Sequence, residues 1–313
     1  MTQQSMQLPP GVQVFERGWL SANNILLGGD ARGAVLVDTG YCTHVGQTAA
    51  LLDAALRADI AGRLRLIVNT HLHSDHCGGN ARLHELYPEV PIWIPPGDFA
   101  AAAAWDEDKL SYRYTGQQCP RFTPQRALRP GELIEQAGLG WQVHAAPGHD
   151  MHAILLFEPQ QRCLISADAL WEHGFGIVFP EIEGEQAFDE VGDTLDLIES
   201  LDAQLVIPGH GRPFVDAPRA LEEARSRLQF FRRYPERHAR HAAKALIMFH
   251  LLEVRERSRQ SLHDWLAASP IYERMRARFY AATPLAQWSE ELLHELAASG
   301  AIKLVADQVM VSD

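Results

Sequence analysis

The chain has 313 residues, of which 46% are hydrophobic and 22% are charged, and its formal net charge is −12. This balance is typical of a soluble globular protein, excludes general disorder, and favours one large domain plus one small domain. No run of about 18 apolar residues is present, so we expect no membrane-spanning helix and no membrane partner. The N-terminal segment lacks the pattern of a secretory signal, and the four cysteines have no paired spacing. We therefore expect a cytoplasmic protein with free thiols.

The charges are unevenly distributed along the chain. Residues 212–278 contain 15 Arg or Lys against 8 Asp or Glu, a net of +7, which leaves −19 on the remainder. An acidic chain is not typical of a general nucleic-acid binder, because the phosphate backbone supplies most of that affinity. The basic segment has two interpretations, a set of solvated helix faces or a surface for an anionic partner, and the first is favoured.

The first half of the chain reads as a β-rich part followed by a βα part. Apolar alternation predicts strands within 12–38, with turns around Gly28-Gly29-Asp30 and Arg32-Gly33. Helical spacing and short apolar runs then predict a helix at 44–57, a strand at 64–69, a helix after Gly79, a strand at 91–94 and a helix at 98–105. Residues 106–130 fit no element clearly.

The second half repeats this order. Three segments after residue 141, WQVHAA, HAILLFE and RCLISAD, read as strands, and they are followed by a helix at about 186–200, a strand at 204–208 and a helix from about 218. Two similar halves of this kind predict two sheets packed face to face with helices outside. From residue 237 the pattern is helical and ends in a hairpin, so we predict a catalytic domain at 1–236 and a small helical, winged-helix-like domain at 237–313.

The strongest chemical signal is the segment His71-Leu72-His73-Ser74-Asp75-His76. It follows the apolar strand directly and precedes two glycines. Because side chains alternate along a strand, His71 and His73 can point the same way, and the turn that follows can aim Asp75 and His76 at a neighbouring point. Four ligand-type side chains within six residues at a strand end predict a metal site.

Three later positions have the same character, since each places a His or Asp directly after a predicted strand. They are His149 in Pro147-Gly148-His149-Asp150, Asp168 in Ser166-Ala167-Asp168, and His210 in Pro208-Gly209-His210-Gly211. A shared site at one edge of the two sheets would collect these three residues together with the first segment.

The ordered set HLHSDH, PGH, Asp after a strand, and PGHG resembles the metallo-β-lactamase superfamily in its dinuclear hydrolase form. The resemblance implies a four-layer αββα sandwich and two divalent metal ions, with Zn²⁺ as the first choice and Mn²⁺ or Fe²⁺ as alternatives. It implies that one ion takes His71, His73 and His149, that the second takes Asp75, His76 and His210, and that Asp168 bridges them.

The chemistry expected of such a site is hydrolysis by a hydroxide shared between two metal ions, because a bound divalent ion lowers the pKa of water towards about 7. We assign Asp75 as the catalytic residue that orients or accepts the proton of this water. Asp38, in the segment Val37-Asp38-Thr39-Gly40, is interpreted as support for a ligand. Cys77 is interpreted as packing. The segment after Asp168 is a candidate substrate pocket, with the residues Trp171, His173 and Phe175.

Several branches of the superfamily fit poorly. Its lactam-cleaving enzymes usually have Cys at the position of Asp168, its flavin-linked oxidoreductases resemble H-x-E-x-D-H, and its RNA-processing branches need an insertion larger than the 60 residues between His149 and His210. We therefore predict a metal-dependent hydrolase of a small ester, thioester or lactone, similar to glyoxalase II. A phosphodiesterase or ribonuclease acting on nucleic acid, and a non-catalytic metal-binding regulatory protein, stay open as alternatives, as does a homodimeric assembly.

Overall fold

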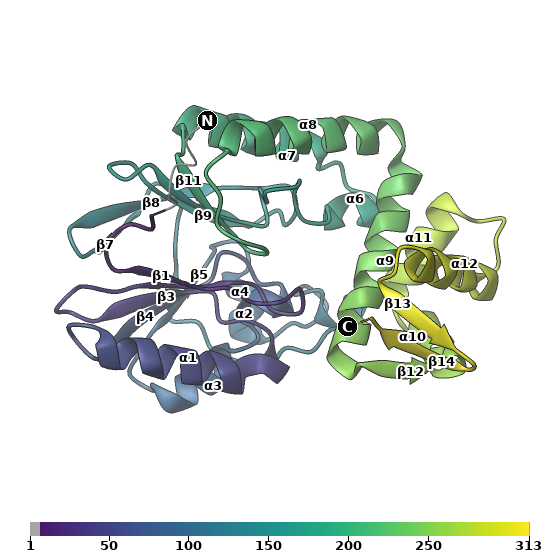
Figure 1. The fold of residues 1–313 in the computed structure, drawn as a ribbon, viewed down its shortest axis with the longest axis horizontal. Coiled ribbons are helices and arrows are strands. Elements are labelled where there is room, and N and C mark those ends of the chain that lie inside the picture. The colour runs from purple at the N-terminus through teal and green to yellow at the C-terminus, as the bar shows by residue number, and fades with distance from the viewer. Residues whose placement is uncertain (1–6, 313) are drawn as a thin grey trace.

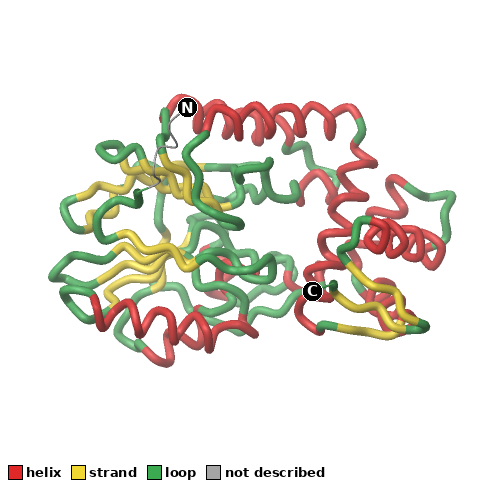
Figure 2. Tube along the Cα trace, in the orientation of Figure 1, coloured by secondary structure: helices red, strands yellow, loops and turns green. Residues whose placement is uncertain are grey.

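A computed structural model describes residues 7–312 of the chain. Residues 1–6, which belong to the segment interpreted as lacking a secretory signal, lie outside the described residues. Two β-sheets face one another, and helices cover the outer face of each, as Figure 1 shows with α1 and α3 below the lower sheet and α7 and α8 above the upper one. A further group of helices and short strands lies beside this sandwich (Figure 2).

The first sheet has six strands in chain order, and its first three are antiparallel while the later ones are parallel. The strands are β1 (Val12–Phe15), β2 (Asn24–Leu27), β3 (Ala34–Val37), β4 (Leu64–Val68), β5 (Ile92–Ile94) and β6 (Arg126–Ala127). The connections between them contain η1 (Cys42–His44), α1 (Val45–Ala58), α2 (Ser74–Cys77), α3 (Asn80–Leu86), α4 (Phe99–Ala104) and α5 (Tyr112–Thr115). Parallel pairing of β3 and β4 brings the ends of both strands, and thus Asp38 and the histidine segment, to the same edge.

The second sheet has five strands in the order β11-β10-β9-β8-β7. They are β7 (Leu133–Gln136), β8 (Leu139–Ala145), β9 (Ile154–Glu158), β10 (Cys163–Ala167) and β11 (Leu205–Pro208), and the helices of this half are α6 (Phe179–Glu183), α7 (Phe188–Leu201) and α8 (Ala217–Arg233). β10 and β11 are parallel, so Asp168 and His210 emerge from neighbouring strand ends. A register shift between Ile165 and Ala167 re-aims the chain just before Asp168.

The sheets are held together by an apolar layer between them. Strand residues buried on both inner faces form one cluster, which includes Trp141, Ile25 and Ile154. Two further clusters lie between each sheet and its helices. Because β2, β3, β9 and β10 are buried along their whole length, they read as continuous apolar runs rather than as alternating patterns.

The C-terminal part consists of α9 (Pro235–Val254), β12 (Glu256–Ser258), α10 (Arg259–Ala268), α11 (Pro270–Phe279), α12 (Leu285–Ala298), β13 (Ile302–Val305) and β14 (Gln308–Val311). Its apolar side chains form a fourth cluster around Trp288 and Ile247. The three strands form a small antiparallel sheet in the order β12-β14-β13.

The predicted α/β sandwich followed by a C-terminal helical region is confirmed by this arrangement. The structure adds elements that the pattern did not indicate, namely α2, α5, α6, β6, β7 and β12, because elements of two to five residues are too short for a period to show. It also adds α11, a helix of ten residues. The predicted boundary at residue 236 falls at the start of α9, directly after α8 ends, and the division into two domains stays a prediction. Within residues 7–312, the apolar length needed to cross a membrane is reached by none of the helices.

Candidate metal centre and active site

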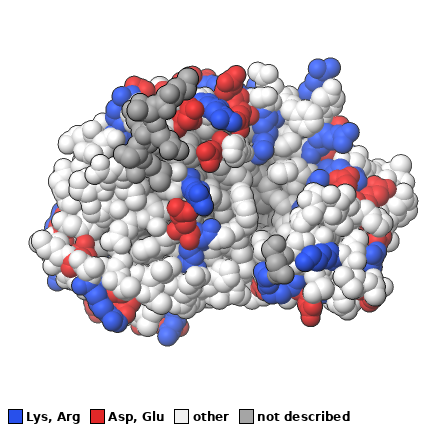
Figure 3. Space-filling view, viewed as in Figure 1, with Lys and Arg blue, Asp and Glu red and all other residues white. Residues whose placement is uncertain are grey.

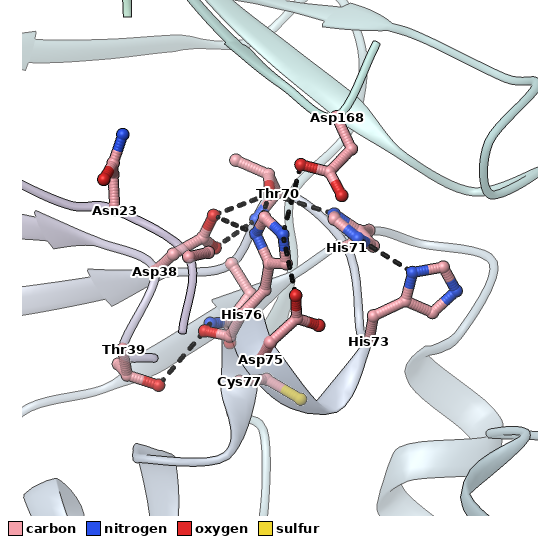
Figure 4. A network of polar contacts seen from close by, with 12 residues as sticks. Asn23, Asp38, Thr39, Thr70, His71, His73, Asp75, His76, Cys77 and Asp168 are labelled. Atoms are coloured by element: carbon pink, nitrogen blue, oxygen red, sulfur yellow. Dashed lines mark hydrogen bonds and ion pairs between the residues drawn. The ribbon is translucent and has the colours of Figure 1, made fainter. Parts of the chain in front are cut away.

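The histidine segment leaves the first sheet after β4 and then turns into the short helix α2. His71 and His73 lie on the extended connection, whereas Asp75 and His76 lie on the helical turn, which begins at Ser74. Gly78 and Gly79 pass close to the backbone of Gly40 and Thr39, where a Cβ atom would have no room. The glycine pair therefore allows α2 to lie directly against the loop that follows β3. Figure 4 shows Asp75 and His76 of α2 next to Asp38 and Thr39 of this loop.

Three imidazole rings converge on one point. Nδ1 of His73 lies 3.1 Å from Nε2 of His71 and 2.8 Å from Nε2 of His149. His149 comes from the loop after β8, so this group joins the two sheets. The three nitrogen atoms lie within 4.8 Å of one another, which is the arrangement expected of ligands to a single ion.

A second group of ligand-type atoms lies beside the first. Nε2 of His210 lies 3.0 Å from Oδ2 of Asp75, and with His76 these residues form a set within 4.8 Å. Asp168 lies between the two groups, because its Oδ2 is 3.3 Å from Nε2 of His149 and its Oδ1 is 3.4 Å from Nε2 of His76. All seven predicted ligand residues are therefore brought together around one small volume.

Asp38 holds the second group in place from behind. Its Oδ2 lies 2.7 Å from Nδ1 of His76, and it also accepts hydrogen bonds from the backbone N and the hydroxyl of Thr70, at 2.9 and 2.8 Å (Figure 4). This contact fixes the ring of His76 so that Nε2 points towards Asp168 and Asp75. An imidazole oriented by a carboxylate on its other nitrogen is the usual arrangement of a metal-ligating histidine.

The electrostatics of the site differ between its two groups. Burial, together with neighbouring His73, lowers the pKa of His149 to about 4. Burial and the nearby histidines also hold the pKa of His71 well below its usual range. For His76, burial lowers the pKa, but the carboxylates of Asp168, Asp38 and Asp75 outweigh it and raise the pKa well above its usual range. His71 and His149 are thus neutral nitrogen donors, whereas the second group is rich in negative charge.

The residues present fit a pair of divalent cations. Nε2 of His76, the atom that faces Asp168 and Asp75, is buried and has no hydrogen-bond partner among the described residues. An unpaired buried nitrogen is unfavourable unless an ion or water completes it. The donors are imidazoles and carboxylates without a thiolate, a set that suits Zn²⁺, Mn²⁺ or Fe²⁺. Gly209 lies directly against Asp168, since a Cβ there would collide with the carboxylate.

The three residues predicted to line a substrate pocket lie in three different environments. Trp171 borders the site, because its Nε1 donates to Oδ1 of Asp168 at 3.2 Å and its ring lies 5.5 Å from that of His210. His173 turns away towards α8, where its Nδ1 lies 2.8 Å from Oε2 of Glu223. Phe175 is buried in the cluster between the second sheet and its helices. Only Trp171 of these three is placed beside the candidate ligands.

Two aromatic residues that the sequence analysis did not select lie at the site. Trp19, on the loop before β2, is 60% exposed although its ring stacks 5.4 Å from that of His210. Phe179, at the start of α6, has its ring 4.9 Å from that of His73. Trp19 is distant from the ligand segments in the chain, and Phe179 begins a helix of only five residues, so no period marks either residue. The one available signal was an isolated Trp in a polar stretch.

Cys77 follows His76 directly but points away from the ligand groups. Its Sγ lies 3.2 Å from the hydroxyl of Tyr112, 3.5 Å from the carbonyl of Leu72 and 3.7 Å from Sγ of Cys119. Burial raises the pKa of this thiol well above its usual range, which disfavours the thiolate that a metal would need. We predict that Cys77→Ser leaves the metal content of the purified protein unchanged, as measured by elemental analysis. Loss of metal in this variant would contradict the assignment of the ligands.

Asp98 is a buried carboxyl group near the site whose Oδ2 has no hydrogen-bond partner among the described residues. Burial and the carboxylate of Asp150 raise its pKa to about 8. The folded protein therefore keeps Asp98 protonated at neutral pH, whereas the unfolded chain releases the proton above its ordinary pKa near 3.8. The stability linked to this proton is fully present below that value and is lost as the pH rises through about 8.

We expect that Asp98→Asn removes this pH dependence, because the amide keeps the shape of the protonated carboxyl and does not titrate. Between pH 6 and 8, the free energy of unfolding of the parent protein should fall by roughly 2 kcal/mol more than that of the variant. Urea denaturation at the two pH values measures the difference. Equal decreases in both proteins would show that Asp98 is charged in the folded state.

The basic segment at 212–278 is partly neutralised within the fold. Eight of its 15 basic side chains form ion pairs, namely Arg212, Arg219, Arg225, Arg232, Arg240, Lys244, Arg259 and Arg276. On the face shown in Figure 3, basic and acidic side chains are interspersed. This distribution is that of solvated helix faces rather than of one continuous cationic surface.

Comparison with known proteins identifies the family. Residues 17–210 match the Metallo-beta-lactamase superfamily. The chain is 28% identical over 223 residues to the acyl-coenzyme A thioesterase MBLAC2 of Bos taurus, covering 64% of this chain and 78% of that protein. It is also 28% identical over 221 residues to the hydroxyacylglutathione hydrolase of Xanthomonas campestris pv. campestris strain B100, covering 70% of this chain and 72% of the relative.

Solved structures share the fold over nearly the whole chain. A metallo-beta-lactamase family protein from Thermus thermophilus has a TM-score of 0.56 at 22% identity and covers 97% of this chain and 100% of that chain. A beta-lactamase domain protein from Burkholderia ambifaria has a TM-score of 0.58 at 20% identity, covering 98% and 94%. The chain therefore belongs to the metallo-beta-lactamase superfamily and is an enzyme of its hydrolase type.

Proposed function

We propose that this protein is a thioesterase that holds two divalent metal ions, with Zn²⁺ as the first choice, and hydrolyses a small thioester to a carboxylate and a thiol. One ion is assigned to His71, His73 and His149, and the other to Asp75, His76 and His210. Asp168 is assigned as the shared ligand. The observation that carries the proposal is the position of Asp168, whose two carboxylate oxygens face one histidine of each group.

The choice of a thioester rests on two kinds of relative. Both MBLAC2 and the hydroxyacylglutathione hydrolase are named for reactions that release a thiol, and both align over about two thirds of this chain. An acyl-coenzyme A and an acylglutathione are the two substrates that these relatives suggest.

The chemistry that two such ions supply when bound is a water activated at neutral pH and polarisation of the carbonyl oxygen. Asp75 is the residue that we assign to proton handling. Its side chain retains 13% exposure, and its Oδ2 is held by Nε2 of His210 at 3.0 Å. A carboxylate fixed in this way can accept a proton from water and deliver it to the departing thiolate, provided that both approach its open side.

Two tryptophan rings would border the bound thioester. Trp19 and Trp171 lie edge to face, with ring centroids 5.4 Å apart, and each also contacts the ring of His210. Such a wall excludes water from one side of the site and offers apolar area to an acyl chain. The hydrogen bond from Trp171 to Asp168 also orients the shared carboxylate.

The test is thiol release from a panel of thioesters by the purified protein, before and after removal of metal with a chelator. We expect turnover of at least one thioester, its loss after chelation, and its recovery when Zn²⁺ or Mn²⁺ is added. A panel of esters, lactones and phosphodiesters run in parallel defines the class. The proposal fails if no thioester is turned over in a metal-dependent way, and turnover of phosphodiesters alone would point to the nucleic-acid alternative.

A further inference from the structure

A cavity of about 740 Å³ opens at the corner where α8 meets α9. α8 contributes Arg227 and Phe230, and α9 contributes Arg237, Arg240 and Lys244. Its volume is in the range of sites that bind small organic ligands. Neither the metal centre nor the proposed reaction uses these residues, so the cavity is a separate feature of the molecule.

The charges in this cavity are not balanced pair by pair. Glu295 is occupied by Arg240 at 2.8 Å and by Lys244 at 3.0 Å. Among residues 7–312, by contrast, no ion pair is formed by Arg227 or Arg237. Arg227 is also half-buried. Burial lowers the pKa of this guanidinium group, and the nearby carboxylate of Glu223, which is paired elsewhere, only partly offsets that effect. An anion from outside the chain would offset the remaining cost of burial.

Acidic groups limit where such an anion can sit. Glu223 lines the cavity but is paired with Arg219 at 3.1 Å and with His173 at 2.8 Å. Glu222 also lines it, is exposed, and forms no ion pair with any described residue. The ligand must therefore place its negative charge near Arg227 and Arg237 and away from Glu222.

An aromatic surface completes the site. Phe230 is 47% exposed although it is a large apolar side chain on a helix that is otherwise amphipathic. Its ring lines the same cavity as the two guanidinium groups. A flat apolar face beside cations that suit phosphate is the combination that recognises a nucleotide, because the base stacks and the phosphate accepts hydrogen bonds.

The cavity is separated from the metal centre by a single loop, residues 171–178. On one side, the backbone N of Gly176 donates to the carbonyl of Asp168 at 2.9 Å, and Nδ1 of His149 donates to the carbonyl of Ile177 at 2.5 Å. On the other side, a Cβ at Gly174 would lie 2.5 Å from Nη1 of Arg227, so that guanidinium group packs directly against the loop. A substrate that extends across this loop can contact the metal centre and the cavity at the same time.

We propose that the α8–α9 cavity binds a phosphorylated nucleotide, with Arg227 and Arg237 on a phosphate group and Phe230 against the base. If the proposed thioesterase function holds, on which this second step rests, the nucleotide is the distal part of the leaving thiol. The substrate class is then a thioester whose thiol carries a phosphorylated nucleotide, rather than a peptide thiol.

Direct binding tests the cavity without reference to activity. Isothermal titration of the full chain with adenosine 3′,5′-bisphosphate at low salt should give saturable binding, and the double variant Arg227→Gln/Arg237→Gln should weaken it at least about tenfold. Arg237→Gln alone should weaken it too, and since that side chain is exposed the variant should fold normally. Glu222→Gln should tighten binding. The matched control is Arg233→Gln, an exposed arginine at the end of α8 that lies outside the cavity.

Each class of probe has a defined outcome. Phe230→Ala should weaken binding of the bisphosphate and of adenosine but not that of inorganic phosphate, because only the first two carry a base. Absence of binding to the parent protein, or equal binding by the double variant, overturns the proposal. Equal affinity for adenosine and the bisphosphate also overturns it, since the guanidinium groups would then have no role.

Kinetics separate this proposal from the proposed function. The bisphosphate should raise KM for a nucleotide-bearing thioester without lowering kcat, and the loss of kcat/KM in the double variant should be larger for that substrate than for the same acyl group on N-acetylcysteamine. A protein that binds the bisphosphate but hydrolyses no thioester would refute the thioesterase and keep the cavity. A protein that hydrolyses thioesters without binding the bisphosphate would refute the nucleotide site and keep the thioesterase.

Discussion

Replacement of Asp75 by alanine is expected to abolish hydrolysis, with a loss in kcat of at least about a thousandfold, while the fold stays intact. The carboxylate has two assigned tasks, because it faces His210 and His76 as a ligand and also presents an open side to water and substrate. Its removal therefore eliminates a donor to one ion and the acceptor of the proton. Steady-state kinetics, metal content and the thermal midpoint together measure these effects.

The variant Asp75→Asn separates shape from charge at this position. The amide keeps the volume of the carboxylate but cannot accept a proton from water, so we expect it to be nearly as inactive as the alanine variant. Asp53→Ala serves as the control, because Asp53 is an exposed residue of α1 paired with Arg57 and should retain full activity. Unchanged turnover in Asp75→Ala would contradict the role given to this residue.

Replacement of Asp168 by alanine is expected to have the second large effect, on metal content as well as on activity. Its carboxylate is the group that faces both histidine sets, and its removal leaves Nε2 of His76 without its nearest carboxylate oxygen. The pKa of Asp168 lies well below its usual range, because the attraction of His76 and His210 outweighs the burial that would raise it. We expect fewer than two ions per chain and no measurable turnover.

A matched control for Asp168 is offered by its neighbour Trp171. Trp171→Phe removes the hydrogen bond to Oδ1 but keeps an aromatic ring beside His210, so the metal content should be retained and activity should fall only modestly. Elemental analysis of protein purified without added metal distinguishes the two variants. An Asp168→Ala protein that keeps two ions would show that the groups are not bridged by this residue.

Local patterns were informative because the ligands follow strands. An apolar run that ends in His or Asp places that side chain at a sheet edge, and this holds for His71, His149, Asp168 and His210 whatever the packing elsewhere. The resemblance carried by these segments predicted the superfamily, and the match over residues 17–210 confirms it. Short elements such as α2 did not appear in the pattern, since four residues complete barely one helical turn.

The surroundings of the site could not be predicted in this way. Phe175 follows Asp168 closely in the chain, yet packing between the second sheet and α8 places its side chain in the core. Trp19 lies far away in the chain and reaches His210 only because β2 belongs to the sheet that faces β11. The basic segment is one block in the sequence, but ion pairs to acids on other helices engage Arg225, Arg232 and Arg240. Within the described part of the chain, Arg227 and Arg237 form none.

The amino-acid sequence by itself predicted two facing sheets and the seven candidate ligands, because these depend on the short-range order of apolar and ligand-type residues. The resemblance of the ordered motifs then implied the family and its αββα sandwich. Only the tertiary structure decided which side chains border those ligands and which charges stay unpaired. The physical reason is that a strand or helix period is set by neighbours along the chain, while contact across a sheet or between helices is set by how complete elements pack.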